Sequence, residues 1–254
     1  MPISKVNYNA ISSSYDNRYE EDQWANIRHE LKELIANNHY QNILEVGCGT
    51  GYWLNAIKSE KNNIFGLDYS FGMLKKAGET GRCKNVVNGD ANFLPFRKNY
   101  FDLIFCLNAI HHFQNKKQFI IDAKRYLAPG GTIAIIGVDP RCKNDEWYIY
   151  DYFDSTYKDD LERFPAWSEI EEWMKQSGFE NVSSKIIDEV KSDKIGKEVL
   201  SDAWLQKGGT SQLSKLSDKE YNEGYNKVLV TLSENKEKIF KVRITFKMIW
   251  GMKK

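Results

Sequence analysis

A glycine-rich turn directly after a short apolar strand is the feature that most constrains how this chain can fold. Residues 42–46 read as a buried strand, glycines follow at positions 47, 49 and 51, and a helical segment begins near Tyr52. Glycine tolerates positive φ angles and lets a ligand approach the backbone closely, and the next helix presents unpaired N–H groups. Ligands of open α/β sheets bind at the carboxyl ends of the strands. The pattern therefore predicts a parallel α/β fold with a binding site at this turn.

Apolar runs alternate with helix-period segments along the first half of the chain. This alternation is typical of βαβ units and predicts an α/β fold with a Rossmann-like, doubly wound, mostly parallel sheet. The expected strands are residues 42–46, 64–67, 86–88, 101–107 and 132–138. The expected helices are residues 21–37, 52–59, 70–77 (with Ser70 as its cap) and 116–127, the last ended by Pro129-Gly130-Gly131.

The pattern changes after Asp139. Residues 139–167 are rich in aromatic side chains, residues 168–177 read as a helix stopped by Gly178, and residues 182–187 read as a strand. A long helix-leaning excursion follows, with a capped start at Ser217, before a final strand over residues 240–250. A late strand, an excursion and a returning last strand predict an antiparallel last strand at the edge of the sheet and a helical, aromatic cap.

Three acidic residues stand at or near the carboxyl ends of the first three expected strands. They are Glu45 directly before the glycine turn, Asp68 after the second strand and Asp90 after the third. The glycine spacing is G-x-G-x-G, whereas dinucleotide enzymes favour G-x-G-x-x-G. Because the carboxyl ends of parallel strands share one edge, we expect the three carboxyl groups to converge on the rim of one crevice.

These segments together resemble the class I S-adenosylmethionine (SAM)-dependent methyltransferases. The resemblance rests on residues 43–51 (ILEVGCGTG), 66–70 (GLDYS), 89–91 (GDA), 101–105 (FDLIF) and 111–113 (HHF). It is closest to the small-molecule branch that includes the ubiquinone and menaquinone enzymes, and it covers roughly residues 40–138. Residues 173–179 (WMKQSGF) are also similar to the last helix and turn of that family.

The resemblance implies that SAM is the cofactor. Asp68 would bind both ribose hydroxyls and Asp90 would accept from the adenine amino group. Glu45 would act near the glycine turn, and the backbone near Leu107 and Asn108 would face the amino-acid end of the cofactor. The full set of implied cofactor-binding residues is Tyr15, Glu45, Gly47, Cys48, Gly49, Gly51, Asp68, Tyr69, Asp90, Ala91, Leu107 and Asn108.

The implied reaction is transfer of a methyl group, by in-line displacement, to a small-molecule acceptor through an oxygen, nitrogen or carbon atom. His111 and His112 are the candidate catalytic residues, because imidazole titrates near neutral pH, although paired histidines at this point often only pack. Asp139, Tyr148 and Tyr152 are further candidates. The aromatic residues between 147 and 167 are expected to hold a planar acceptor, to pack a cap against the core, or both.

The sequence as a whole also suggests a domain organisation. We expect one methyltransferase domain over residues 1–254, with residues 1–38 as an amino-terminal lid and helix and residues 39–138 as the SAM-binding core. Residues 139–167 and 190–237 would be cap insertions on the acceptor side. Trp204 and Leu205 would belong to the acceptor wall or to a contact between two copies, so that a homodimer is left open.

Three alternatives remain at this point. The same fold can use SAM for cyclisation, alkyl transfer or pericyclic chemistry, since a fold does not fix a reaction. A nicotinamide-dependent oxidoreductase is disfavoured by the glycine spacing and by the place of Asp90. A SAM-binding module without catalysis is disfavoured because Gly47 and Asp68 are both present.

Charge and cysteine content limit the partners. The chain has 36 basic and 35 acidic residues, which gives a formal net charge of +1. Such a balance provides no general attraction for nucleic acid or an anionic membrane. No apolar run reaches the ~20 residues that span a bilayer. The four cysteines form no C-x-x-C pair, and no metal site is expected. The chain is thus expected to be cytoplasmic, with reduced thiols.

Overall fold

A mixed sheet of eight strands runs through the computed structural model, which describes residues 8–12, 15–19 and 22–254. Within these residues the order is β3-β2-β1-β4-β5-β10-β6, with β7 also paired to β10. The strands are β1 (Asn42–Val46), β2 (Asn63–Asp68), β3 (Val86–Asn88), β4 (Phe101–Leu107), β5 (Leu127–Gly137), β6 (Glu146–Trp147), β7 (Glu180–Lys191) and β10 (Val242–Met252).

The first five strands are parallel and the last strand is antiparallel to its neighbours. Strand β1 pairs in parallel with β2 and β4, and β10 pairs in antiparallel fashion with β5, β6 and β7. The predicted Rossmann-like, mostly parallel α/β sheet with an antiparallel last strand is therefore confirmed. One detail differs, because β10 lies between β5 and β7, so that the edge is formed by β7 rather than by the last strand.

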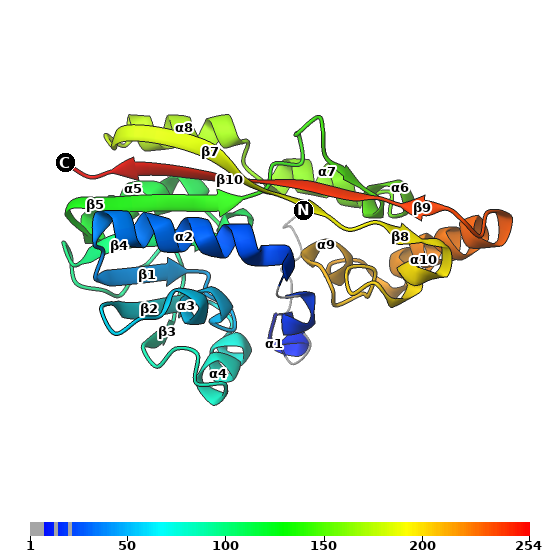
Figure 1. Cartoon of the computed structure of the whole chain (residues 1–254), viewed down its shortest axis with the longest axis horizontal. Coiled ribbons are helices and arrows are strands. Elements are labelled where there is room, and N and C mark those ends of the chain that lie inside the picture. Colours follow the sequence, from blue (N-terminus) through cyan, green and yellow to red (C-terminus); the bar gives the residue numbers. More distant parts are fainter. Residues whose placement is uncertain (1–7, 13–14, 20–21) are drawn as a thin grey trace.

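Helices cover both faces of the sheet. They are α2 (Ala25–Asn38), α3 (Tyr52–Ile57), α4 (Phe71–Glu79), α5 (Lys116–Tyr126) and α8 (Trp167–Gln176). Side chains of β4 alternate between two cores: Phe105 packs with Leu31 of α2, whereas Ile104 packs with Phe119 of α5. Alternation with both faces buried is what a central strand requires, and Figure 1 shows α2 on one side of the sheet and α5 and α8 on the other.

Most predicted elements lie within a few residues of the observed ones. Ser70 caps α4 by accepting a hydrogen bond from the N–H of Met73 at 3.3 Å, as predicted. Helix α5 ends one residue earlier than expected, and Pro129 and Gly130 lie inside β5 rather than before it. The predicted first helix, residues 21–37, starts later, at Ala25, and Glu21 lies outside the described residues.

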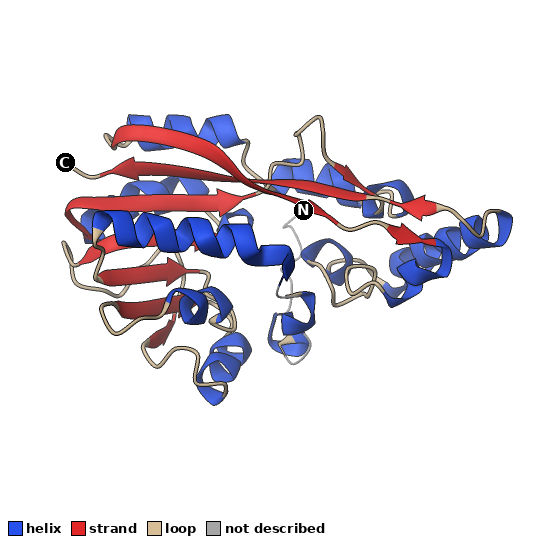
Figure 2. Ribbon diagram, viewed as in Figure 1, coloured by secondary structure: helices blue, strands red, loops and turns tan. Residues whose placement is uncertain are grey.

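A cap, predicted as residues 139–167 and 190–237, extends beyond the carboxyl ends of the parallel strands (Figures 1 and 2). It contains α6 (Ile149–Tyr152), α7 (Thr156–Arg163), β8 (Lys194–Ile195), α9 (Ser211–Ser214) and α10 (Asp218–Glu234), and β9 (Ile239–Phe240) pairs with β8. Side chains such as Ile149, Leu213 and Val228 give the cap a core of its own. Because β10 is long enough to join both parts, its first residues pair with β6 and its last with β5.

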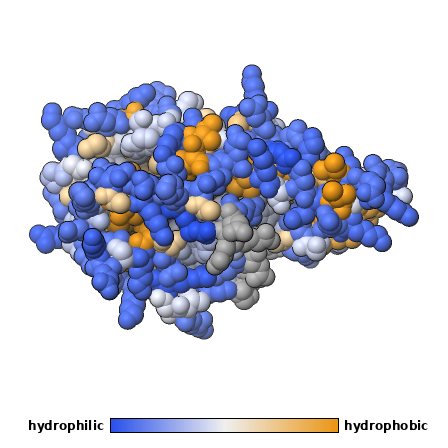
Figure 3. Space-filling model, in the orientation of Figure 1, coloured by the Kyte–Doolittle hydropathy of each residue, from blue (hydrophilic) through white to orange (hydrophobic). Residues whose placement is uncertain are grey.

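The face seen in Figure 3 is mostly hydrophilic, with small separate hydrophobic patches. No helix in the described parts of the chain is both long and apolar enough to cross a bilayer. The amino-terminal helix α1 (Tyr8–Ile11) lies close to α4, and 3₁₀ turns follow at Tyr15–Arg18 and Asp22–Trp24.

Candidate functional site

The glycine turn after β1 has the backbone conformation that its sequence predicts. Gly47, Gly49 and Gly51 have φ angles of +81°, +53° and +72°. The N–H groups of Gly47 and Cys48 both donate to the carbonyl oxygen of Leu67 in β2, at 2.7 and 3.1 Å. A Cβ atom on Gly47 would overlap Ala109, whereas one on Gly49 would meet no protein atom within 4 Å. The turn is thus packed tightly at its first glycine and open at its second.

The carboxylate of Asp68 holds this turn in place. One of its oxygens accepts from the N–H of Gly49 and the other from the N–H of Ser70, each at 2.8 Å. Burial raises the pKa of Asp68, and the N–H donors of Ser70, Gly49 and Tyr69 partly offset that effect. Each oxygen keeps a lone pair for a further donor.

Glu45 is a buried acid with an unsatisfied atom. Its side chain is 1% exposed, and Oε2 has no hydrogen-bond partner among the described residues. Burial, and next the charge of Asp68, raise the pKa of Glu45 well above its usual value. Buried polar atoms are almost always hydrogen-bonded, so this oxygen marks a place where the donor of a ligand would fit.

A cavity of about 580 Å³, the small cavity, brings the predicted residues together. Of the predicted site residues, those that line it are Tyr15, Glu45, Gly47, Cys48, Gly49, Asp68, Tyr69, Asp90, Ala91, Leu107, Asn108, His111 and His112. Gly51 does not line it; it precedes α3, and a Cβ there would lie 3.3 Å from Ala77. Glu45 with its orphan oxygen, and the open space at Gly49, fit a ligand that carries a donor and lies against the turn.

A larger cavity of about 880 Å³, the large cavity, adjoins the small one. The two share the lining residues Tyr8, Tyr15, Trp24, Asn108, His111, His112 and Phe246, which we call the common wall. The other aromatic residues that line the large cavity come mainly from the cap. They are Trp147, Tyr148, Tyr150, Tyr152, Tyr157, Phe164, Trp204 and Phe240. Asp139 also lines it, whereas Phe153 and Leu205 belong to the core of the cap.

The two adjacent histidines have different surroundings. The ring of His111 stacks on Phe164 at 3.8 Å and is 6% exposed. Burial, followed by the charges of His112 and Arg163, lowers the pKa of His111 well below its usual value. The Nε2 atom of His112 lies 2.6 Å from the hydroxyl of Tyr8, which belongs to the amino-terminal segment.

Several residues at the site carry no sequence motif. Asn9 accepts hydrogen bonds from the Ser70 hydroxyl and the Gly72 N–H, both at 2.8 Å, and thereby ties α1 to the start of α4. Asp16 pairs with Arg82 at 2.6 Å. Arg163, at the end of α7, lines the small cavity with two unpartnered nitrogen atoms. The sequence indicates these residues only in that they are polar and lie in segments expected to cover the site.

Residues 44–135 match a family model described as a methyltransferase domain. The chain is 26% identical over 205 residues to a demethylmenaquinone methyltransferase of Lactiplantibacillus plantarum, across 69% of this chain and 86% of that protein. It is 30% identical over 192 residues to the chloroplastic 2-methyl-6-phytyl-1,4-hydroquinone methyltransferase of Arabidopsis thaliana, across 71% of this chain and 53% of that protein. The chain thus spans about half the length of this plant relative.

The fold is also found among solved structures. A protein described as a methyltransferase from an antibiotic biosynthesis pathway of Anabaena variabilis superposes with a TM-score of 0.68 and 17% identity. The match covers 87% of this chain and 96% of that one, so it includes most of the cap as well as the sheet. At this identity the likeness concerns the fold.

Proposed function

The chain is a class I SAM-dependent methyltransferase, and from that premise we propose that it methylates a small molecule held in the large cavity. The observation that carries the proposal is the common wall, where His112 and Asn108 line both cavities. A methyl donor on one side of this wall and an acceptor on the other would be aligned for in-line transfer. Such alignment can supply up to ~7–11 kcal/mol of the barrier reduction.

We propose that the small cavity binds SAM. The free lone pairs of Asp68 would accept from the ribose hydroxyls, and Asp90 would accept from the adenine amino group. The orphan Oε2 of Glu45 would accept from the ammonium group of the methionine part. Bound SAM supplies a methyl group on a positively charged sulfur, which an acceptor nucleophile takes as the neutral thioether leaves.

An aromatic acceptor, such as a hydroquinone-like ring, suits the large cavity best. Trp147, Tyr157 and Phe164 provide flat apolar faces along its walls, and aromatic pairs stabilise each other in stacked or edge-on contacts. The two relatives described above are named for quinone-type acceptors, which supports this choice. The oxygen, nitrogen or carbon atom that receives the methyl group is left to experiment.

We propose His112, rather than His111, as the general base for an acceptor that must lose a proton. His112 lies on the common wall with its Nε2 beside a hydroxyl, so a proton can pass between them. His111 is held by its stack on Phe164, and its low pKa makes it a weak base. General base catalysis contributes typically ~10²–10⁴-fold.

The predicted domain organisation remains part of this proposal. Residues 1–38 would act as the lid, and the bonds of Asn9 to α4 and of Asp16 to Arg82 support that role. Residues 39–138 would bind SAM, and the insertions 139–167 and 190–237 would shape the acceptor cavity. The part of the lid in residues 1–7, 13–14 and 20–21 lies outside the described residues.

Calorimetric titration with SAM, S-adenosylhomocysteine and NADH tests the cofactor site. We expect binding of both adenosyl compounds and none of NADH. Incubation with SAM and a panel of hydroquinones and phenols, with unfractionated tRNA as the comparison, should then release S-adenosylhomocysteine only with the small molecules. Release of methylthioadenosine instead, or methylation of the tRNA, would contradict the proposal.

Replacing Asp68 by alanine should weaken SAM binding by about 100-fold or more, because it removes two hydrogen bonds to a charged group. Glu79→Ala, on the exposed side of α4, is the matched control. His112→Ala should leave SAM affinity close to that of the wild type and lower the turnover. Unchanged SAM affinity in Asp68→Ala would refute the cofactor assignment, and unchanged turnover in His112→Ala would refute the base.

A further inference from the structure

Arg163 is a buried cation with hydrogen-bonding capacity left over. Its side chain is 4% exposed, and Nη2 donates to Asp160 at 2.5 Å and to the Ser211 hydroxyl at 3.2 Å. Its Nε and Nη1 atoms have no hydrogen-bond partner among the described residues. Since Nε carries one N–H and Nη1 carries two, three of the five donors of the guanidinium are unsatisfied. Arg163 lines the small cavity, and these two nitrogen atoms are buried at its wall.

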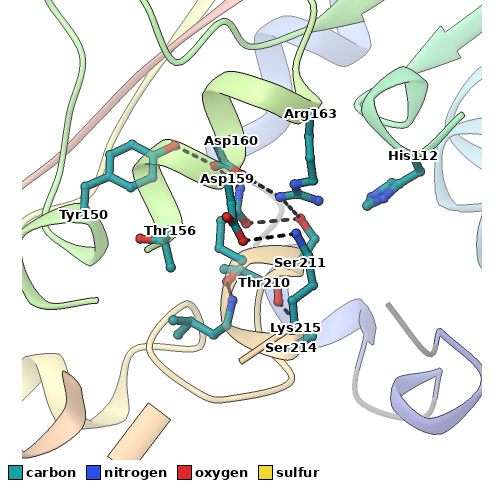
Figure 4. A network of polar contacts seen from close by, with 12 residues as sticks. His112, Tyr150, Thr156, Asp159, Asp160, Arg163, Thr210, Ser211, Ser214 and Lys215 are labelled. Atoms are coloured by element: carbon teal, nitrogen blue, oxygen red, sulfur yellow. Dashed lines mark hydrogen bonds and ion pairs between the residues drawn. The ribbon is translucent and has the colours of Figure 1, made fainter. Parts of the chain in front are cut away.

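The partner of Arg163 cannot satisfy the remaining donors. Asp160 is fully buried, and its second oxygen already accepts from the Tyr150 hydroxyl at 2.8 Å and from Gln212 at 2.6 Å. Burial and the neighbouring Asp160 raise the pKa of Tyr150, so its hydroxyl remains a donor. Figure 4 shows Arg163 reaching towards Asp160 and Ser211, with its guanidinium on the side of His112. The network therefore fixes the orientation of the guanidinium and leaves its other donors free.

Two basic side chains, Lys116 and His111, lie near Arg163 in addition to its partner Asp160. Lys116 also lines the small cavity, and burial together with the charge of Arg163 lowers its pKa. The charge of Arg163 likewise lowers the pKa of His111. The three acids of the small cavity stand at the ends of β1, β2 and β3. A buried cation with unsatisfied donors is costly unless an anion or a lone pair completes it.

The hydrogen-bond network around Arg163 extends to the large cavity. Ser211 accepts from Arg163, and Tyr150 and Gln212 donate to its partner Asp160. These three residues line the large cavity, whereas Arg163 itself lines the small one. Trp147 of the large cavity also has an unpartnered buried donor, Nε1. The unsatisfied side-chain atoms of Trp147 and Arg163 are all donors, which call for oxygen acceptor atoms on the ligand.

We infer that Arg163 binds an anionic oxygen group, a carboxylate or a phosphate, on the methyl acceptor. The inference rests on the proposed function and narrows its substrate class to aromatic acids. The ring of the acceptor lies among the aromatic side chains of the cap, and its anionic group takes up the free donors of Arg163. Asp160 is a positioning residue, because it pairs with the guanidinium and lines neither cavity, and Tyr150 and Gln212 donate to it. Arginine is suited to this role since its planar fork matches carboxylate and phosphate geometry.

The test titrates three probes into the protein saturated with S-adenosylhomocysteine: 4-hydroxybenzoate, phenyl phosphate and the neutral 4-hydroxybenzamide. We expect at least one anionic probe to bind about 10- to 100-fold more tightly than the amide. Arg163→Met should abolish this preference and leave the affinity for S-adenosylhomocysteine within about twofold. The stronger of the two anionic probes identifies a carboxylate or a phosphate as the recognised group.

Two further variants keep the result interpretable. In the single variant Arg163→Met, the carboxylate of Asp160 stays buried without its partner, which can unfold the protein. The double variant Arg163→Met with Asp160→Asn removes both charges, and it should lose the preference for the anionic probes in the same way. Lys215→Met is the matched control, because Lys215 is a buried cation of the same network that pairs with Asp159 and lines neither cavity. It should keep the wild-type preference.

Three outcomes would overturn the inference. They are equal binding of acid and amide, no binding of either anionic probe to the wild-type complex, and loss of S-adenosylhomocysteine affinity in Arg163→Met. The last would assign Arg163 to the carboxylate of the cofactor. Failure of the proposed function is distinguishable from all three, since wild-type protein would then not bind S-adenosylhomocysteine in the first step.

Discussion

Alanine at Gly47 and alanine at Gly49 should have different consequences, although both residues belong to the same turn. At Gly47, with φ at +81°, the new Cβ would lie within 3.0 Å of the Cβ of Ala109, where an ordinary carbon–carbon contact is about 3.5–4.0 Å. Left-handed backbone costs an alanine about 1–2 kcal/mol, and overpacking adds about 1–3 kcal/mol. Gly47→Ala should therefore lower the free energy of unfolding by about 2–5 kcal/mol.

Gly49→Ala should cost only the backbone strain, about 1–2 kcal/mol, since its Cβ would meet no protein atom within 4 Å. Its methyl group would instead project into the small cavity and lower SAM affinity by about tenfold or more. Urea denaturation measures the first quantity, and calorimetric titration with SAM measures the second. In thermal unfolding, each kcal/mol corresponds to about 2–4 °C for a chain of this size.

The double variant Gly47→Ala with Ala109→Gly isolates the steric part of the cost. It should recover about 1–3 kcal/mol relative to the sum of the two single variants. The reasoning would be refuted if Gly47→Ala and Gly49→Ala were equally stable, or if the double variant recovered nothing. Normal SAM affinity in Gly49→Ala would show that the cofactor does not lie against this turn.

Two further predictions concern buried titratable groups. Glu45 has a raised folded-state pKa, so its contribution to stability is fully present at low pH and is lost as the pH rises through that value. Glu45→Gln should therefore gain thermal stability relative to the wild type between pH 5 and pH 8 while it binds SAM less tightly, and a constant difference in Tm would contradict this. His111 has a lowered pKa, and the unfolded chain takes up its proton below about pH 6.5. Stability in urea should thus fall below that pH by up to about 1.4 kcal/mol per unit, and His111→Phe should remove this slope; an equal slope in the variant would show that other groups carry it.

The sheet and the small cavity could be predicted because their determinants are local in sequence. The bounds of β1, β3 and β4 agree with the predicted strands, since each is a short apolar run between turn residues. Parallel strands that end at one edge then bring Glu45, Asp68 and Asp90 to one cavity without further information. The family resemblance implies that Gly51 binds the cofactor, but Gly51 does not line the small cavity and instead precedes α3 with a left-handed backbone.

The cap could not be predicted in the same detail because its contacts join distant segments. The hydroxyl of Tyr148 donates to Asp202, 54 residues away, and Gln212 donates to Asp160, 52 residues away. Aromatic composition indicated that a cap exists, but periodicity does not show which polar residues of two insertions meet. Arg163 belongs to no motif, and the role proposed for it rests on its burial and its unsatisfied donors.

Among the residues that the structure describes, most of the buried polar side-chain atoms without a hydrogen-bond partner belong to residues that line the two cavities. Of the four side chains with buried polar atoms that lack a partner in the described chain, Glu45, Trp147 and Arg163 line one of the two cavities, and nothing in the structure explains the fourth, Asp188. Native proteins leave few such atoms, so their concentration at the cavities indicates that ligands complete them. Their signs differ: Glu45 requires a donor, whereas Trp147 and Arg163 require acceptors. In the proposed complex, the ammonium group of the cofactor would satisfy Glu45 at the end of β1, and an anionic group of the acceptor would satisfy Arg163 at the end of α7.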